Sequence, residues 1–318
     1  MADKSHFKPK TFAIIGAGPV GCIVAAFLAK GGYKTILCDI VPQILKAALN
    51  NGITLTGKEN ITQKIFAACS DISELEQYNP DVIIIAAKAN ASAKISESVN
   101  KIRKQNSYVI SWQNGIDTEL EIAKHIDKKA IIRAVVNYGC VPIGNAKVNV
   151  GFHHPPHFIQ ELDPQSQSQA KIIAEAFTKA GLHTEHTQNL AVKIWRKSAL
   201  NISMNPVSAL TGLTVSKAMG NPHARTIVDA LLMECIKIAK TFNIDIGDDF
   251  YDYAVNYMEN AGDHKTSMLM DIEAKRKTEI EFMNQKVVEY GEKAEIKTPY
   301  NLTITSLIKG REAAILLN

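Results

Sequence analysis

The sequence predicts an α/β fold with a mainly parallel sheet in its N-terminal part and an all-helical C-terminal part. In the first half, short apolar runs alternate with helix-like stretches, which is typical of a parallel sheet covered on both faces. After about Asn189, nearly every segment repeats its apolar residues with helical period. We therefore expect one domain over residues 8–188 and a second over residues 189–318.

The expected elements follow from these two patterns. Five buried strands are predicted in the first half, at Thr11–Ile15, Lys34–Asp39, Asp81–Ala86, Ser107–Trp112 and Ala130–Val136. Helices are expected between them, at Val20–Lys30, Gln43–Asn50, Ala91–Gln105 and Thr118–His125. Shorter strands over Val148–Glu161, a helix over Gln167–Ala180 and a strand over Leu182–Glu185 complete this domain. The second domain is expected to contain helices at Ala191–Asn205, Ala224–Phe242, Phe250–Glu259 and Met268–Tyr290.

Composition and charge exclude several classes of partner. The chain has 318 residues and a formal charge of only +4, so neither nucleic acid nor a membrane surface is an expected partner. The apolar run Thr11–Gly16 is too short to span a bilayer. Single, scattered cysteines fit reduced thiols in a cytoplasmic protein rather than a disulfide framework or a zinc site; they are Cys22, Cys38, Cys69, Cys140 and Cys235.

A G-x-G-x-x-G motif joins the first expected strand to the first expected helix. Gly16 allows a tight turn, Gly18 lets the backbone approach a pyrophosphate, and Gly21 lets the helix pack closely. The helix N-terminus then offers N–H groups to the phosphates. A plain glycine turn is the alternative, but the strand and helix context favours a Rossmann domain that binds a nicotinamide dinucleotide. The expected cofactor-binding loop consists of Gly16, Ala17, Gly18, Pro19, Val20 and Gly21.

An acidic residue follows at the end of the second expected strand. A carboxylate at Asp39 can accept hydrogen bonds from the adenosine ribose hydroxyls. The alternative is an aspartate in the loop that starts the next helix.

Three polar residues lie along one face of the first helix of the second domain. Lys197, Asn201 and Asn205 have i, i+4 and i+8 spacing, and most positions between them are apolar. Pro206 disfavours helical geometry at the residue before it, so we expect a kink that frees Asn205 to point into a cleft. A solvated lysine is the alternative for Lys197, but two amides on the same stripe favour catalysis.

Further candidates follow two strands of the expected parallel sheet. Lys88 comes after the run at Asp81–Ala86, and Asn114 comes after the run at Ser107–Trp112. Ligands of open parallel sheets bind outside these strand ends. His153 and His157 flank two prolines with no acidic or cysteine neighbour, so a loop is favoured there over a metal site, and no metal is expected.

These blocks together resemble the ketopantoate reductase family, whose members reduce 2-dehydropantoate to pantoate in pantothenate biosynthesis. The resemblance covers nearly the whole chain, and the glycine motif alone would not establish it. The blocks are the N-terminal fingerprint, Ala87-Lys88-Ala89, Asn114-Gly115, Trp195-Arg196-Lys197 with Asn201 and Asn205-Pro206, Ser267-Met268 with Asp271, and Thr278-Glu279-Ile280.

The resemblance implies a role for each candidate. Lys197 matches the general acid, and Glu279 matches the carboxylate that orients or charges it. A surface helix with i, i+4 charge pairs is the alternative for Glu279. The expected substrate is a small 2-oxo acid, and a homodimer is a candidate assembly. Substrate-binding groups are expected at Asn201, Asn205, Ser267 and Asn114, while Asn114 and Lys88 line the nicotinamide side.

The chemistry of reduction agrees with these roles. Hydride addition to a ketone carbon places negative charge on oxygen, which a nearby ammonium can stabilise and protonate. The expected cofactor is NAD or NADP, and NADH is expected to be preferred. Many members of the family carry an arginine just after the second strand, whereas this chain has Asp39, whose carboxylate would repel a 2′-phosphate. Lys34 and Lys46 are the nearest cations in the sequence.

Departures from the family pattern concern the substrate pocket. His264 and Val215 stand where asparagines are common, and the segment after the glutamate reads Met283-Asn284-Gln285. They favour an alternative: an NAD-dependent D-2-hydroxyacid dehydrogenase acting on another branched or aromatic 2-oxo acid. A non-catalytic dinucleotide sensor is a further alternative, which the intact candidate set disfavours.

On one straight helix, Ser267 and Glu279 would lie roughly 18 Å apart, at about 1.5 Å per residue.

Overall fold

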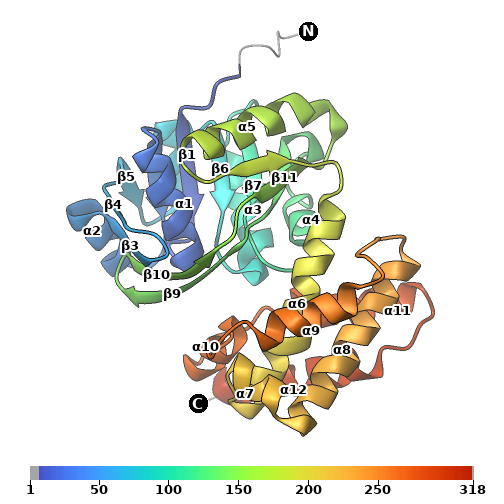
Figure 1. The fold of residues 1–318 in the computed structure, drawn as a ribbon. Helices are drawn as coiled ribbons and strands as arrows, with labels where there is room; N and C mark the ends of the chain where they lie inside the picture. The colour runs from blue at the N-terminus through green and yellow to red at the C-terminus, as the bar shows by residue number, and fades with distance from the viewer. Residues whose placement is uncertain (1–6, 317–318) are drawn as a thin grey trace. The chain divides into compact units, whose positions relative to one another are not determined.

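The computed structural model describes residues 7–316, which form two compact units (Figure 1). Unit 1 contains the residues up to Gln113 and the segment Asp117–Leu190. Unit 2 begins at Ala191 and also includes the short segment Asn114–Ile116 from the first half of the chain. Each unit has its own core and is described separately.

Unit 1 is built on an eight-stranded, mainly parallel sheet, as predicted. Neighbouring pairs are parallel except β8 with β11, which are antiparallel. At the centre, Ile14 lies opposite Leu37 on one side and Ile84 on the other. The strands, in spatial order, are β12 (Thr184–His186), β11 (His157–Glu161), β8 (Ile131–Val135), β7 (Tyr108–Ser111), β6 (Val82–Ile85), β1 (Thr11–Ile15), β2 (Lys34–Cys38) and β5 (Ala67–Cys69).

Helices cover both faces of this sheet (Figure 1). Ile14 packs in one core with residues of α1 (Pro19–Lys30) and α5 (Gln167–Lys179). Its neighbour Ile15 points to the other face, into a core with residues of α3 and α4. This alternation explains why the central strands read as continuous apolar runs. The remaining helices of unit 1 are α2 (Pro42–Asn51), α3 (Ser92–Ile102), α4 (Thr118–Ile122) and the 3-10 helices η2 (Ile72–Tyr78), η3 (Ala89–Ala91), η4 (Lys128–Ala130) and η5 (Pro164–Ser166).

A second, four-stranded sheet in unit 1 was only partly predicted. The strands expected over Val148–Glu161 divide between the two sheets, because β10 (Lys147–His153) joins the smaller sheet and β11 the larger. Cα positions of β10 pair with β3 in parallel and with β9 in antiparallel orientation. The order is β4 (Ile61–Gln63), β3 (Ile53–Gly57), β10 and β9 (Tyr138–Gly144).

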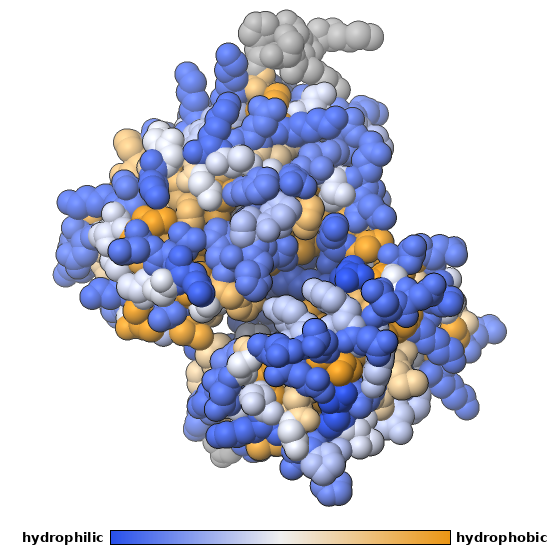
Figure 2. All heavy atoms as spheres, in the orientation of Figure 1, coloured by the Kyte–Doolittle hydropathy of each residue, from blue (hydrophilic) through white to orange (hydrophobic). Residues whose placement is uncertain are grey.

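Unit 2 is helical, as predicted. In the described part of the chain, no helix is both long and apolar enough to cross a membrane. Hydrophilic side chains cover most of the face seen in Figure 2, with apolar residues scattered among them. The helices are α6 (Leu190–Thr211), α7 (Val215–Gly220), α8 (Pro222–Thr241), α9 (Phe250–Glu259), α10 (Ser267–Glu273), the 3-10 helix η6 (Ile280–Phe282), α11 (Asn284–Lys293) and α12 (Pro299–Leu316).

Two expectations for unit 2 were wrong. Helix α6 continues through Pro206 to Thr211 instead of ending at Asn205. Proline removes one helical hydrogen bond, but burial of residues just beyond it, such as Val207, helps to offset the loss. The single helix expected over Met268–Tyr290 is also interrupted. Helix α10 ends at Glu273, Lys275 has a positive φ of 52°, and η6 precedes α11.

Candidate active site

The glycine motif forms the tight turn between β1 and α1. Gly16 has a φ of +106°, and a Cβ there would lie 2.5 Å from the backbone nitrogen of Ala87. A Cβ on Gly21 would lie 1.8 Å from the carbonyl oxygen of Gly16. Each of these two positions therefore requires glycine, whereas a Cβ on Gly18 would meet no atom within 4 Å.

The open space at Gly18 fits a diphosphate. Gly18 is the exposed N-cap of α1, a helix of 12 residues, and Pro19 follows it. The first turn carries no acidic residue. Backbone N–H groups at a helix N-terminus and the helix dipole favour an anion, and the missing side chain lets it approach the backbone. Ala17 and Val20 complete the loop between these positions.

Asp39 has a contact that sequence reasoning did not anticipate. Its carboxylate accepts a hydrogen bond from the backbone N–H of Ala17 at 2.5 Å and another from Val41 at 2.9 Å. Asp39 thus ties the end of β2 to the glycine loop. A carboxylate has about four lone-pair directions, so it retains capacity for a ribose hydroxyl. The ammonium of Lys34 lies over the ring of Phe66, 4.4 Å from its centroid.

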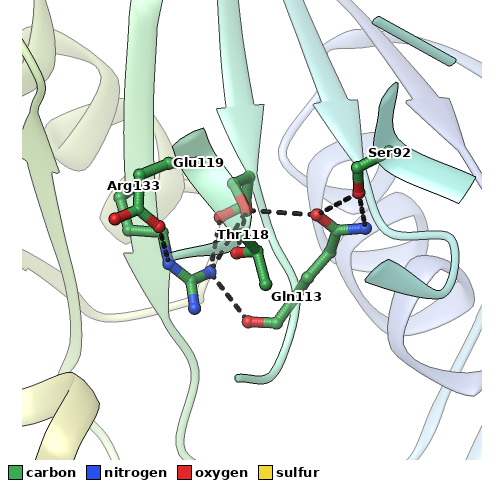
Figure 3. Close-up of polar contacts among 6 residues, drawn as sticks. Ser92, Gln113, Thr118, Glu119 and Arg133 are labelled. Carbon is green, nitrogen blue, oxygen red and sulfur yellow. Dashed lines mark hydrogen bonds and ion pairs between the residues drawn. The ribbon is translucent and has the colours of Figure 1, made fainter. Parts of the chain in front are cut away.

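A buried polar network joins the ends of β7 and β8 to residues of α3 and α4 (Figure 3), and Gln113 extends it to Ala87 after β6. The Gln113 side-chain N–H donates to the carbonyl oxygen of Ala87 at 2.6 Å and to the Ser92 hydroxyl at 2.9 Å. Ala87 directly precedes Lys88, which is half-buried at the start of η3. The network therefore braces the turn that holds one candidate, Lys88, and ends one residue before another, Asn114.

Arg133 is the charged member of this network. Its Nη1 donates to the carbonyl oxygen of Gln113 at 2.8 Å, and its Nε lies 3.0 Å from Glu119 Oε2. The Arg133 side chain is 3% exposed and that of Glu119 is 14% exposed. Sequence reasoning missed both residues, although an arginine inside the apolar run Ala130–Val136 was a usable signal, because charged residues are rarely buried without a partner.

In unit 2, the structure brings Lys197 and Asn114 into direct contact. Lys197 Nζ donates a hydrogen bond to Asn114 Oδ1 at 2.8 Å, and both side chains are half-buried. The segment after Asn114 is also held: Ile116 N–H donates to the Phe282 carbonyl oxygen at 2.8 Å. Gly115 has a φ of +102°, and a Cβ there would lie 2.7 Å from both Phe282 Cβ and the Phe282 oxygen.

Glu279 is buried, which rules out the exposed helix face that was its alternative. It is 7% exposed and directly precedes η6, whereas the surface pair is formed by Lys277 and Glu281 at 3.1 Å. The preceding residue, Thr278, donates its N–H and its hydroxyl to Glu312 Oε1, each at 2.6 Å. The carboxylate of Glu312 on α12 thus fixes the backbone just before Glu279.

The asparagines of α6 differ in their surroundings. Asn205 is 6% exposed, and its Nδ2 lies 3.9 Å from Met283 Sδ, close to the end of η6. Asn201 is half-buried, as is Ser267 at the start of α10. Among residues 7–316, neither of these two side chains has a hydrogen-bond partner in the protein, so both retain groups for a ligand.

The two departures from the expected pattern lie beside one another. Val215 is buried at the start of α7, and its N–H donates to the carbonyl oxygen of His264 at 3.0 Å. The His264 side chain itself is exposed.

The paired histidines form a hydrogen-bonded chain rather than an open metal site. Asn137 N–H donates to His157 Nδ1, so neutral His157 carries its proton on Nε2. That nitrogen lies 3.1 Å from His153 Nε2, and His153 Nδ1 lies 2.5 Å from Glu59 Oε1. A metal on His157 Nε2 would have to displace its proton, so this arrangement favours a structural role.

A parallel sheet with an open glycine loop, followed by a helical unit that presents a lysine–asparagine pair, defines a dinucleotide-dependent oxidoreductase. The chain belongs to the ketopantoate reductase PanE/ApbA family. The model of that family matches residues 12–163, and the model of its C-terminal domain matches residues 189–312. The protein is thus an NAD(P)-dependent oxidoreductase.

Named relatives match along nearly the whole chain. A 2-dehydropantoate 2-reductase of Archaeoglobus fulgidus is 26% identical over 307 residues, covering 95% of this chain and 98% of the relative. One from Streptococcus pyogenes is 27% identical with the same coverage.

Solved structures share the fold. The ternary structure of D-mandelate dehydrogenase with NADH and anilino(oxo)acetate has a TM-score of 0.86 at 24% identity, covering 96% of this chain and 99% of that one. A PanE/ApbA family ketopantoate reductase from Ralstonia eutropha has a TM-score of 0.85 at 24% identity and the same coverage.

Proposed function

We propose that this protein reduces the 2-oxo group of ketopantoate, with hydride from a nicotinamide and a proton from Lys197. The observation that carries the proposal is the 2.8 Å hydrogen bond from Lys197 Nζ to Asn114 Oδ1. In this contact a neutral amide orients the half-buried ammonium group. Because the amide carries no charge, the contact does not neutralise the positive charge of Lys197. Relatives with the name 2-dehydropantoate 2-reductase along the whole chain support the choice of substrate.

A nicotinamide dinucleotide held by the glycine loop and Asp39 would supply, when bound, the hydride that adds to the carbonyl carbon. The electron pair of the carbon–oxygen π bond then moves to the oxygen and gives an alkoxide. Lys197 stabilises this alkoxide and protonates it. The neutral lysine regains a proton from solvent. The overall change is 2-oxo acid plus reduced cofactor plus one proton, giving 2-hydroxy acid and oxidised cofactor.

The remaining candidates have complementary tasks in this proposal. Asn201 and Ser267 retain free side-chain groups, which suit the carboxylate and hydroxyl of ketopantoate. Glu279, buried beside Thr278, orients or charges Lys197. Asn205 contacts Met283, so its part is to shape the pocket wall as well as to contact substrate. Lys88 and Asn114 line the nicotinamide side.

A second candidate function is the reduction of another branched or aromatic 2-oxo acid to a D-2-hydroxy acid. The observation that favours it is the buried, apolar Val215 beside the backbone of His264, where the family commonly has asparagines. An apolar wall suits a larger hydrocarbon substituent better than the hydroxymethyl end of ketopantoate.

A panel of 2-oxo acids tests both functions. Purified protein is assayed with NADH and with NADPH against ketopantoate, 2-oxoisovalerate, phenylpyruvate and benzoylformate. We expect the largest kcat/KM for ketopantoate. A value at least tenfold higher for an aromatic acid supports the second function, and no turnover of any acid by folded protein supports a dinucleotide sensor instead.

NADH is proposed as the preferred cofactor. The Asp39 carboxylate lies at the end of β2 with no cation within ion-pair distance among the described residues, and Lys34 is placed over an aromatic ring. About 1.4 kcal/mol of repulsion toward a 2′-phosphate gives a tenfold preference. Because Asp39 also anchors Ala17, Asp39→Ala disturbs the loop itself.

A cleaner test of cofactor choice changes the neighbouring residue. Ile40 is 87% exposed, so Ile40→Arg adds a guanidinium and leaves both hydrogen bonds of Asp39 in place. We expect the NADPH/NADH ratio of kcat/KM to rise at least tenfold, while Ile40→Gln serves as the uncharged control. A wild-type protein that already uses NADPH as well as NADH contradicts the preference.

A homodimer is proposed as the assembly, because a Staphylococcus aureus ketopantoate reductase of the same fold is described as dimeric. Light scattering after gel filtration measures the mass directly.

The described cysteines form no disulfide, which fits the reducing conditions of the cytoplasm.

A further inference from the structure

We propose that Gln113 is a positioning residue, which with Arg133 sets the geometry of the nicotinamide side of the dinucleotide crevice. The inference rests on the proposed dinucleotide binding, but not on the identity of the 2-oxo acid. It depends on the buried network of Figure 3, which lies in unit 1 and contains none of the groups assigned to catalysis or substrate.

The side-chain amide of Gln113 bridges two strand ends. Its N–H group donates to Ala87, after β6, and its Oε1 accepts from the hydroxyl groups of Ser92 at 3.1 Å and Ser111 at 3.2 Å. Gln113 is 6% exposed, so these bonds have little competition from water. The amide therefore fixes the separation between the turn after β6 and the end of β7.

The backbone of Gln113 is held as firmly as its side chain. Arg133 Nη1 donates to the Gln113 carbonyl oxygen, and also lies 3.2 Å from the Ser111 carbonyl oxygen. The ion pair with Glu119 holds the guanidinium from the other side, as Figure 3 shows. The carbonyl that Arg133 binds belongs to the peptide bond leading into Asn114, so the orientation of that peptide is set by a residue on β8.

The position of the network in the sheet assigns it to one half of the cofactor. Strands β2 and β5 lie on one side of β1, and β6, β7 and β8 on the other, so the crevice opens between β1 and β6. Asp39, the candidate ribose ligand, follows β2. The adenosine half therefore extends over β2, and the nicotinamide half over β6 and β7, where Gln113 holds Ala87.

Two ligands separate a local effect from general damage. NADH contains the nicotinamide half, and ADP-ribose lacks the nicotinamide ring. In Gln113→Leu, the Ala87 carbonyl loses its donor and the turn before Lys88 loses its support. We expect the Kd for NADH, measured by fluorescence without substrate, to rise about tenfold, while calorimetry gives a Kd for ADP-ribose within twofold of wild type.

The matched control lies elsewhere in the same sheet. Gln160 on β11 also bridges backbone groups, since it accepts from Leu190 N–H at 3.0 Å and donates to Gln188 at 3.3 Å. Gln160→Leu should leave both dissociation constants unchanged. Ser92→Ala, which removes one partner of the amide and keeps the bond to Ala87, should give a smaller rise for NADH and keeps the test available if Gln113→Leu does not fold.

The outcomes distinguish the positioning role of Gln113 from the proposed function. Equal weakening of NADH and ADP-ribose, or the same loss in Gln160→Leu, overturns the role of Gln113 while leaving dinucleotide binding intact. An unchanged NADH affinity in both folded Gln113→Leu and Ser92→Ala does the same. A wild-type protein that binds neither ligand overturns the proposed function, and the positioning role of Gln113 with it.

Discussion

Replacing Gly115 by alanine tests whether the segment after Asn114 is as constrained as its contacts indicate. Gly115 has a positive φ of 102°, and the new Cβ would lie 2.7 Å from two atoms of Phe282. One of them is the carbonyl oxygen that accepts the Ile116 N–H, so Phe282 cannot withdraw without weakening that bond. We expect backbone strain of about 1–3 kcal/mol and an overlap cost of about 1–3 kcal/mol.

Gly212 provides the matched control, because it separates the two costs. It also lies in unit 2 and has a positive φ of 74°, but its Cβ would meet nothing within 4 Å. Gly212→Ala therefore measures backbone strain alone, reduced by about 0.4–1 kcal/mol from restricting the unfolded chain. Urea unfolding should show Gly115→Ala to be less stable than Gly212→Ala by about 1–3 kcal/mol.

Turnover should follow the same order as stability. Because Asn114 is adjacent to Gly115 and receives the Lys197 hydrogen bond, displacement of the segment should lower kcat about tenfold in folded Gly115→Ala. Gly212→Ala should retain wild-type kcat. Equal stability of the two variants within about 0.5 kcal/mol, together with normal turnover in Gly115→Ala, would refute the reasoning.

Three further predictions concern single side chains. Lys197→Ala should lower kcat by about 10²–10⁴-fold with NADH affinity nearly unchanged; exposed Lys237→Ala is the control, and full turnover in Lys197→Ala removes lysine from the mechanism. Ser267→Ala should raise KM for the 2-oxo acid about tenfold with a smaller change in kcat, while exposed Ser306→Ala should not, and an unaltered KM excludes Ser267 as a substrate contact. Burial raises the pKa of the Cys22, Cys38 and Cys235 thiols to about 12, so iodoacetamide at pH 8 should modify half-buried Cys140 first; mass mapping that finds Cys235 labelled as fast contradicts this.

The larger sheet was predictable because its central strands are buried on both faces. Strands such as β1 and β6 read as unbroken apolar runs, and the glycine motif fixes the turn after β1. The smaller sheet was harder to predict, since its strand β4 has only three residues. The pairing of β3 with β10 joins residues far apart in the sequence, such as Thr54 and Lys147.

The break between Ser267 and Glu279 left only a weak signal in the sequence. No glycine or proline lies between Ser267 and Tyr290, but the polar run Lys275–Glu279 interrupts the apolar spacing. The structure attributes the break to tertiary contacts, because Glu312 on α12 binds the backbone and hydroxyl of Thr278. The distance of roughly 18 Å expected for one straight helix therefore does not apply.

The candidate residues themselves were predicted from spacing and resemblance, whereas the hydrogen bonds that hold their surroundings in place were not predicted. The i, i+4 spacing placed Lys197 and Asn201 on one face of a continuous helix. The anchoring of Ala17 by Asp39 and of Ala87 by Gln113 could not be inferred, because the acceptor or donor is in each case a backbone group. Backbone groups are the same in every residue and carry no sequence signal.

The three-residue excursion Asn114–Ile116 has a consequence for recombining enzymes of this family. A chimera joined near Leu190 would exchange the helical unit but leave this segment behind with the donor of the sheet. Lys197 would then meet an asparagine, and Phe282 a glycine, supplied by a different parent. Substrate preference should transfer fully only when residues 114–116 are exchanged together with the helical unit. The residues that determine catalysis are therefore encoded in two separate stretches of the gene.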